Sequence, residues 1–417
     1  MSVLSNKVHN TSQLKTGNQA AILSLLRRMD GMSRVALTKA LGMTKGGITP
    51  LIQELLALGM ICETERVDTR SGRKPILMKT RNDCCCAISL DWSRSHLFSA
   101  LVDFGGNIQE RRELFFHAPF PTQKKVIDSA LSMIETLRSL APAPVIGVGI
   151  SVPGPIDYES GSLLVPPNFN GWGNIPLRQI VEEQTGLPVF VENNARAHTL
   201  AERDFGYGKQ YQSFLQLVVD EGIGGGIVQD GRLLQGMAGG AGEIGHITVN
   251  IDGESCPCGN NGCLELYASV PQMLKNAEQM KRQGLFPDDL LPTADTGMNW
   301  STFVGLAQTG NRLAEAVVKK EADFIGCGIA SAVNLLEPQA VVIGSLLAKL
   351  GDMILQPVCL YLQKHTMYRR EIPVLASQLK DPALLGTSAD IFSRFIDGTL
   401  GSYRAVLTNH KLQDREN

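Results

Sequence analysis

Residues 222–265 hold three motifs in close succession: GIGGG at 222–226, GRLLQGMAGGAGEIGH at 231–246 and CPCGNNGCLE at 256–265. The glycine run offers backbone amides that no side chain covers. The segment GEIGH sets a carboxylate, Glu243, close to an imidazole, His246, and three cysteines follow shortly afterwards. The rest of the chain is organised around this stretch.

The histidine and the cysteines predict a metal site. His246, Cys256, Cys258 and Cys263 follow the spacing H-x9-C-x-C-x4-C, and three thiolates with one imidazole form a tetrahedral zinc set. Because the protein supplies every ligand, such a zinc ion is structural and keeps no open position for chemistry. The alternative is a loop of ordinary buried cysteines, which the glycines and the proline between the cysteines disfavour.

This combination of motifs resembles the ROK family of repressors, open reading frames and sugar kinases, and the resemblance extends over essentially the whole chain. In that family a sugar binds between two lobes. The resemblance implies sugar contacts from the PN, END-like, GEIGH and CLE motifs, that is from Asn168, Asn193, Asn194, Glu243, His246 and Glu265. Carboxylates and amides suit this task, because sugar hydroxyls both donate and accept hydrogen bonds. The resemblance also implies that the zinc ion holds His246 in orientation for the sugar.

Length and charge divide the chain. At 417 residues it is long enough for two or three domains with a sizeable core. Residues 1–82 contain six Lys and seven Arg against five acidic residues, a net charge of +8, whereas the remainder carries −10. A small basic module ahead of an acidic body indicates that the first domain binds a polyanion.

The cysteines and the hydropathy pattern favour the cytoplasm. Cys84, Cys85 and Cys86 open the apolar run CCCAISL, so we expect a buried strand there and no disulfide framework. The polar N-terminus does not have the pattern of a signal peptide, and no apolar run approaches the ~20 residues that cross a bilayer. We therefore expect a cytoplasmic protein without stable membrane insertion.

The first 82 residues predict a winged helix-turn-helix. Apolar spacing and capping residues predict a helix over 18–29 capped by Asn18, a second over 33–41 capped by Ser33, and a third opened by Thr44 and ended by Gly59. Two strand-like runs then flank a basic turn at 69–73. In this fold the second and third helices form the DNA-reading pair.

The same segment looks like the DNA-binding half of ROK repressors. On that pattern the major groove is faced by Thr44, Lys45, Thr49 and Gln53, and phosphate or the minor groove is met by Arg70, Arg73 and Lys74. Glycine at 46 and 47 and proline at 50 are poor residues for a helix interior, so Thr49 could instead cap a helix that begins at Pro50. The alternative function for this domain is a three-helix protein-interaction module.

From residue 83 onwards, strands alternate with helices, which is typical of an α/β fold. Strands are expected at 84–92, 96–104, 113–117, 145–152 and 188–194, and helices at 123–140, 176–186, 270–284, 300–308, 311–335 and 384–395. The expected fold is a winged helix-turn-helix over 1–82 followed by a two-lobed, actin-like, ribonuclease H-like body. The first lobe spans 83–194 and is completed by a C-terminal helix near 380–400, and the second spans 195–379 with the zinc knuckle.

Residues that a ROK kinase needs for phosphotransfer are altered. The family's catalytic aspartate is replaced by Asn194, and an amide cannot take a proton from the sugar hydroxyl. The next asparagine of the family pattern is replaced by Arg196. The first phosphate loop reads DWSRS from Asp91, and Asp220 and Glu221 stand where the second loop of the kinases carries GTG. Carboxylates repel a triphosphate, so we expect a sugar sensor and no enzyme.

The sequence therefore predicts a ROK-type transcriptional regulator, in the first instance a repressor of sugar uptake and catabolic genes. It would bind operator DNA as a homodimer or tetramer, and a sugar or sugar phosphate in the cleft would change its affinity for DNA. One alternative is an active ATP-dependent sugar kinase with an appended DNA-binding domain. Another is a repressor controlled by a protein partner, such as a component of sugar transport.

Overall fold

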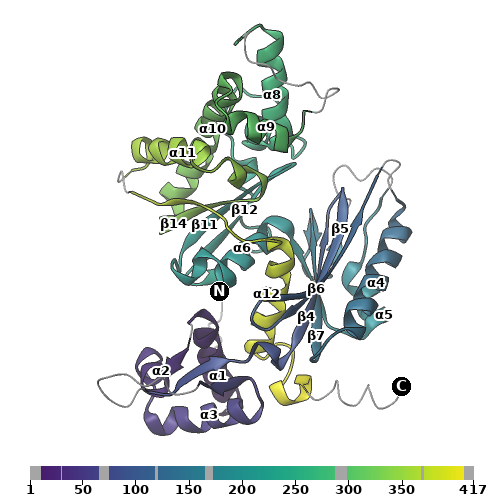
Figure 1. Ribbon diagram of the computed structural model, residues 1–417, viewed down its shortest axis with the longest axis vertical. Coiled ribbons are helices and arrows are strands. Elements are labelled where there is room, and N and C mark those ends of the chain that lie inside the picture. The colour runs from purple at the N-terminus through teal and green to yellow at the C-terminus, as the bar shows by residue number, and fades with distance from the viewer. Residues whose placement is uncertain are drawn as a thin grey trace, which may run out of the picture. The chain divides into compact units, whose positions relative to one another are not determined.

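The chain forms two compact units, each built on a five-stranded sheet (Figure 1). The computed structural model describes residues 11–29, 31–64, 75–117, 121–164, 172–286, 298–367 and 371–407. The first unit consists of Met1–Asn194 together with Ala383–Asn417, and the second is Ala195–Pro382.

The first unit begins with three helices and a small sheet. The helices are α1 (Thr11–Arg28), α2 (Arg34–Ala40) and α3 (Lys45–Ala57), and the strands β1 (Met32–Ser33), β2 (Ile61–Glu63) and β3 (Leu77–Thr80) pair in the order β1-β3-β2. Two of the three predicted caps are confirmed: Ser33 Oγ accepts a hydrogen bond from the Ala36 amide at 3.1 Å, and Thr44 Oγ1 accepts one from the Gly47 amide at 3.2 Å. The segment between β2 and β3 that carries the predicted turn, residues 65–74, lies outside the described residues.

Helix α1 starts earlier than the sequence predicted, and Asn18 lies inside it instead of capping it. The reason is a contact with α3. Lys15 Nζ and Gln19 Nε2 donate to the two carboxylate oxygens of Glu54 at 2.9 and 3.0 Å. These bonds stabilise the first turns of a helix whose polar sequence alone gives a weak signal.

Helix α3 continues through Pro50, so the alternative in which a helix begins at Pro50 is wrong. Thr49 does not act as an N-cap, because its hydroxyl donates to the Lys45 carbonyl at 2.7 Å. The helix loses one backbone hydrogen bond at the proline but buries an apolar face made of Ile48, Leu51, Ile52 and Leu55. Packing of that face outweighs the local preference of the sequence.

The larger sheet of the first unit has the order β10-β7-β4-β5-β6. Its strands are β4 (Cys86–Trp92), β5 (His96–Asp103), β6 (Ile108–Phe115), β7 (Val145–Val152) and β10 (Val189–Asn193), with the short pair β8 (Ile156–Asp157) and β9 (Ser162–Leu163) beside it. Helices α4 (Gln123–Ser139) and α5 (Leu177–Thr185) cover one face and α12 (Pro382–Ile396) covers the other, as Figure 1 shows. Cys85 and Cys86 are buried, as predicted, whereas β6 begins several residues before the predicted strand.

Helix α1 is also attached to this sheet. The guanidinium carbon of Arg27 lies 4.9 Å from the ring centroid of Phe104 and 5.2 Å from that of Phe392 on α12. The two rings meet edge to face at 5.3 Å. The first helix of the chain therefore contacts its last long helix through a cation–π cluster, an interaction worth about 0.5–2 kcal/mol.

The second unit is built on the sheet β13-β12-β11-β14-β15. Its strands are β11 (Phe214–Val219), β12 (Ile223–Gln229), β13 (Arg232–Leu233), β14 (Ala340–Gly344) and β15 (Val374–Ala376). Its helices are α6 (Asn194–Phe205), α7 (Glu265–Ala268), α8 (Val270–Arg282), α9 (Trp300–Gln308), α10 (Arg312–Leu336) and α11 (Asp352–His365). Helices α8, α9 and α10 confirm their predictions, whereas α11, which contains Pro357, was not predicted.

The glycine run at 224–226 lets a helix approach a strand. A Cβ atom on Gly224 would lie 2.6 Å from the Cβ of Ala195, and one on Gly226 would lie 2.1 Å from Thr199 Oγ1. Any side chain at these positions would displace α6 from β12. The run therefore serves close packing, a role that its interpretation as open backbone amides did not foresee.

Among the residues that the structure describes, no helix combines the length and the apolar character needed to cross a membrane.

A carboxylate in the core of the second unit makes the stability of the protein depend on pH. Glu321 of α10 is 0% exposed, and its Oε1 accepts a hydrogen bond from Asn276 Nδ2 of α8 at 2.5 Å. Burial raises the pKa of Glu321 from 4.5 to about 7. The folded state therefore favours the neutral acid, so its contribution to stability is complete below about pH 4.5 and is lost as the pH rises to about 7.

We predict that Glu321→Gln removes this pH dependence, because the amide keeps an acceptor for Asn276 and never ionises. At pH 8 the variant should be more stable than the wild type by roughly 3 kcal/mol, since each pKa unit corresponds to about 1.4 kcal/mol. Urea unfolding between pH 4 and pH 8 measures the difference. Glu315→Gln, which changes an exposed residue of the same helix, should keep the wild-type pH profile; equal profiles for all three proteins would contradict the prediction.

Candidate ligand and metal site

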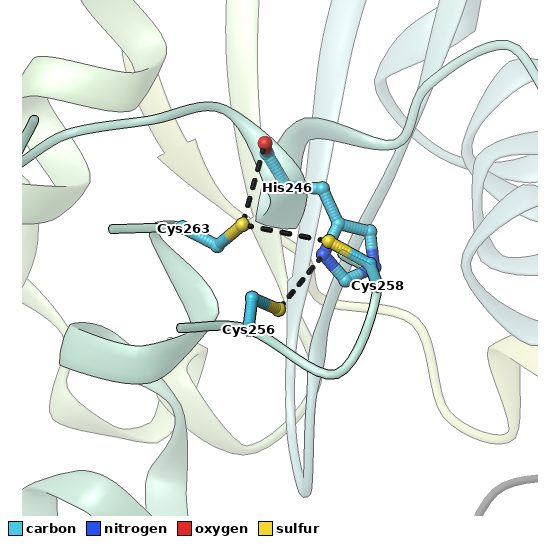
Figure 2. A group of neighbouring side chains, drawn as sticks. All are labelled: His246, Cys256, Cys258 and Cys263. Carbon is cyan, nitrogen blue, oxygen red and sulfur yellow. Dashed lines mark hydrogen bonds between the residues drawn. The ribbon is translucent and has the colours of Figure 1, made fainter. Parts of the chain in front are cut away.

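The histidine and the three cysteines of the central stretch lie together in the second unit. The ligand atoms of His246, Cys256, Cys258 and Cys263 all lie within 4.8 Å of one another. Figure 2 shows the three sulfur atoms and the imidazole ring pointing toward a common centre. Cys256 Sγ lies 3.7 Å from His246 Nδ1, and Cys258 Sγ lies 3.7 Å from Cys263 Sγ. The sequence therefore predicted correctly that these four side chains lie together.

Backbone bonds of the loop between β13 and α7 hold the cysteines in place. The Cys256 amide donates to the Asn260 carbonyl at 2.7 Å, and the Gly262 amide donates to the Glu254 carbonyl at 2.8 Å. Gly262 has a φ of 62°, and a Cβ atom there would lie 1.7 Å from the Asn250 carbonyl oxygen. Only glycine fits this turn, and the turn presents Cys258 and Cys263 to the same side.

The cluster fits a tetrahedrally coordinated metal ion. Sulfur atoms bound at about 2.3 Å around a tetrahedral centre lie about 3.8 Å apart, which agrees with the 3.7 Å between Cys258 and Cys263. Burial, together with the neighbouring thiols, raises the pKa of Cys263 to about 12, whereas a hydrogen bond from the Asn260 amide lowers the pKa of Cys258. A cation among these sulfur atoms would stabilise all three as thiolates. All nine cysteines are free thiols, so no disulfide competes for these ligands.

The other residues expected from the second unit surround the start of β12. Glu265 is the first residue of α7, and its Oε2 accepts a hydrogen bond from the Ile223 amide at 2.7 Å. Gly245 packs so closely on the Ile223 carbonyl that a Cβ atom would lie 2.0 Å from it. The His246 amide donates to the Glu243 carbonyl at 3.1 Å, and the Glu243 side chain is exposed. Glu243, His246 and Glu265 are thus held around one strand end.

In the first unit, Asn193 ends β10 and Asn194 begins α6. Glu192, 8% exposed, accepts hydrogen bonds at Oε1 from the Tyr158 hydroxyl at 2.8 Å and from the Asn193 amide at 2.9 Å. These bonds fix the turn from the strand into the helix. Asn168 lies outside the described residues.

Two of the three carboxylates at the altered phosphate loops, those of Asp91 and Asp220, have partners inside their own unit. Asp91 Oδ2 lies 3.2 Å from His96 Nε2, and His96 Nδ1 lies 2.7 Å from Ser93 Oγ. In the second unit, the Ser345 hydroxyl donates to the Asp220 carboxylate. Sequence reasoning missed both pairs. His96 belongs to no recognised motif, although it is only five residues from Asp91, whereas Ser345 is 125 residues from Asp220 and leaves no local signal.

The side chains expected to meet DNA lie on α3 as far as the structure describes them. Lys45, Thr49 and Gln53 follow one another at intervals of four residues, so they share one side of the helix. Lys45 and Gln53 are exposed and Thr49 is half-buried, whereas Thr44 uses its hydroxyl to cap the helix. The expected wing residues Arg70, Arg73 and Lys74 lie outside the described residues.

The chain is similar to known proteins over almost its entire length. It is 30% identical over 400 residues to the xylose repressor of Caldicellulosiruptor bescii, with 92% of this chain and 97% of that protein covered. A solved ROK family transcriptional regulator, described as a homologue of the Escherichia coli Mlc protein, has a TM-score of 0.78 and 27% identity, covering 95% of this chain and 99% of that one.

A sugar kinase is similar over a smaller part. The ROK family glucokinase of Streptomyces griseus, solved with glucose and AMPPNP, has a TM-score of 0.64 and 28% identity, covering 73% of this chain and 98% of that one. The sequence profile of the ROK family matches residues 87–392. This match spans most of the chain and includes every residue of the metal cluster, and the similarity to the repressors extends it toward both ends. The chain therefore belongs to the ROK family.

Proposed function

We propose that this chain is a ROK-family transcriptional repressor of genes for sugar uptake or catabolism, which binds operator DNA and responds to a sugar without phosphorylating it. The main support for this proposal is the share of the chain over which it is similar to each relative. The xylose repressor and the Mlc-like regulator cover 92% and 95% of this chain, whereas the glucokinase covers 73%. The difference corresponds to about the length of the basic N-terminal segment.

The N-terminal segment supports the DNA-binding half of the proposal. We assign residues 1–82 to a winged helix-turn-helix, because three helices are combined with a small antiparallel sheet whose first strand lies between α1 and α2. Its net charge of +8 favours a polyanion. The proposed contacts are Thr44, Lys45, Thr49 and Gln53 for the bases, and Arg70, Arg73 and Lys74 for the backbone or the minor groove.

The altered kinase positions support a sensor without phosphotransfer. Asn194 cannot act as a general base, and loss of a base alone costs about 100- to 10,000-fold in rate. Asp91 is bonded to His96, and Asp220 is bonded to Ser345. Their carboxylates are therefore engaged within the protein, and their charge opposes a triphosphate.

The proposed effector is a monosaccharide or its phosphate. We assign its contacts to Asn168, Asn193 and Asn194 of the first lobe, residues 83–194, and to Glu243, His246 and Glu265 of the second lobe, residues 195–379. A sugar that contacts both lobes can change DNA affinity only by preferring one arrangement of them. We further propose a homodimer or tetramer, since two winged helices on a palindromic site multiply affinity.

We also propose that the metal ion is zinc and that its role is structural. One imidazole and three thiolates suit Zn²⁺ better than Mg²⁺ or Ca²⁺, which prefer oxygen ligands. The ion would hold the imidazole of His246 through Nδ1, which leaves Nε2 for a sugar hydroxyl.

The zinc proposal predicts the effect of Cys258→Ser. Loss of one thiolate should weaken metal affinity by more than the roughly 10- to 100-fold that loss of an outer hydrogen-bond partner costs, and it should lower the thermal stability. Metal analysis after dialysis and a thermal unfolding curve measure both effects. Cys359→Ser on α11 is the control and should change neither. A Cys258→Ser protein with full zinc content and unchanged stability would refute the site.

The repressor proposal predicts that DNA binding and sugar response can be separated by two substitutions. Lys45→Ala should weaken operator binding by about 10-fold or more, the equivalent of one good contact, and should keep sugar affinity. Glu243→Ala should keep operator affinity and lose the sugar response. Lys319→Ala, an exposed change on α10, is the matched control for charge.

Fluorescence anisotropy on operator DNA and calorimetry with D-xylose, D-glucose and N-acetyl-D-glucosamine measure these effects. If Lys45→Ala binds the operator with wild-type affinity, Lys45 does not contribute to the interface and the proposed role of α3 is wrong. Phosphorylation of any of these sugars by the wild type with ATP would revive the kinase alternative.

A further inference from the structure

Arg196 occupies a position that the proposed function does not use. It lies on α6, is only 4% exposed, and stands where the family pattern has an asparagine. Its Nη1 donates to the Leu234 carbonyl at 2.9 Å and approaches the Ala241 carbonyl at 3.4 Å. These carbonyls stand at the two ends of the segment 234–241, which is called the 234–241 loop below. A single guanidinium thus contacts both ends of the loop.

The 234–241 loop has little other support among the described residues. The Leu234 amide donates to the Ile227 carbonyl at 2.8 Å, and the Ala241 amide donates to the Gln235 carbonyl at 3.2 Å. Its side chains are few and exposed: Met237 is fully exposed and Leu234 is 38% exposed. The position of the loop therefore depends on bonds at its ends and not on a buried apolar face.

The base from which Arg196 reaches the loop is rigid. Helix α6 packs on β12 without intervening side chains, because Gly224 meets Ala195 and Gly226 meets Thr199. The guanidinium is buried, and a buried cation is tolerated only when its donors find acceptors. The two loop carbonyls supply such acceptors, so the position of α6 is transmitted to the loop.

The far end of the loop leads directly into the residue proposed to bind sugar. Ala241 is followed by Gly242, where a Cβ atom would lie 2.6 Å from the Gly225 carbonyl oxygen, and then by Glu243. Ile244 is buried beyond it. Glu243 therefore lies between a tightly packed glycine pair and the buried Ile244, and Arg196 holds the chain on the entry side.

We propose that Arg196 is a positioning residue for effector binding: it fixes both ends of the 234–241 loop and so sets the orientation of Glu243 toward a polyhydroxylated ligand. An asparagine amide also has two N–H donors, but its side chain is too short to bring them from α6 to the carbonyls that Arg196 Nη1 reaches. The inference rests on the proposed sugar-binding role of Glu243. It predicts that loss of the Arg196 guanidinium lowers the order of the loop and the affinity for the ligand.

The test compares Arg196→Ala and Arg196→Lys with Arg203→Ala in the full-length protein. Arg203 is the matched control, because it lies on the same helix and pairs with Asp204 at 2.6 Å. Amide hydrogen exchange of residues 234–243 reports the order of the loop without any ligand. Calorimetry with D-xylose, D-glucose and N-acetyl-D-glucosamine reports ligand affinity. Operator binding and zinc content show whether the DNA-binding segment and the metal site remain intact.

We expect Arg196→Ala to speed exchange in the 234–241 loop and to weaken sugar binding by about 10-fold or more, the equivalent of one hydrogen bond to a charged group. Arg196→Lys keeps the charge and enough donors, but its side chain is shorter than that of arginine and lacks the fixed guanidinium plane, so it should give an intermediate affinity. Operator binding without sugar and zinc content should stay at wild-type values in every variant. This combination separates a positioning role from general loss of structure.

Two results would overturn the role of Arg196: wild-type exchange in Arg196→Ala, or wild-type sugar affinity in both Arg196 variants. If Arg196→Ala does not fold, the exchange rates and the sugar affinity of Arg196→Lys provide the test, and wild-type values for both would overturn the role of Arg196. Absence of binding of every sugar by the wild-type protein is a different failure. It overturns the proposed effector site, and the exchange data then still decide whether Arg196 orders the loop.

Discussion

The close packing of α6 on β12 is the constraint on which the second unit depends. Two glycines of β12 remove the side chains that would separate the helix from the strand. This contact places Arg196 under the 234–241 loop. The Ile223 amide at the start of the same strand holds Glu265, and Gly245 packs on the Ile223 carbonyl. These contacts order the residues that are proposed to bind hydroxyls or a metal ion.

Carboxylates at the altered phosphate loops form hydrogen bonds within the protein. In each unit a carboxylate that would face nucleotide phosphates is bonded to a neighbour: Asp91 to His96, and Asp220 to Ser345. We propose that Asn194 takes the place of the catalytic base of the family's kinases. In the proposed function, the fold keeps the residues that bind sugar and lacks those that bind and activate ATP. The free energy of sugar binding can then shift the equilibrium between conformations of the protein.

Much of the fold and of the metal site could be predicted from the sequence, because these features are local. The caps Ser33 and Thr44, helices α4, α8, α9 and α10, and the cysteine spacing all depend on neighbours along the chain. Predictions failed where distant contacts decide. Helix α1 extends beyond Asn18 because Lys15 bonds to Glu54, and α3 passes through Pro50 because its apolar face is buried. The partners of Arg196 and Asp220 were hidden for the same reason.

This member of the ROK family is proposed to be a DNA-binding protein that responds to a sugar. The most direct measurement is selection of fragments of the source genome on the purified protein at near-physiological salt, followed by elution with single sugars. We expect a discrete, two-fold symmetric site beside genes for sugar uptake or catabolism, and a change in protein binding to that site when the sugar handled by those genes is added. Retention of DNA that is salt-sensitive and independent of sequence, with no response to any sugar, would contradict this proposal.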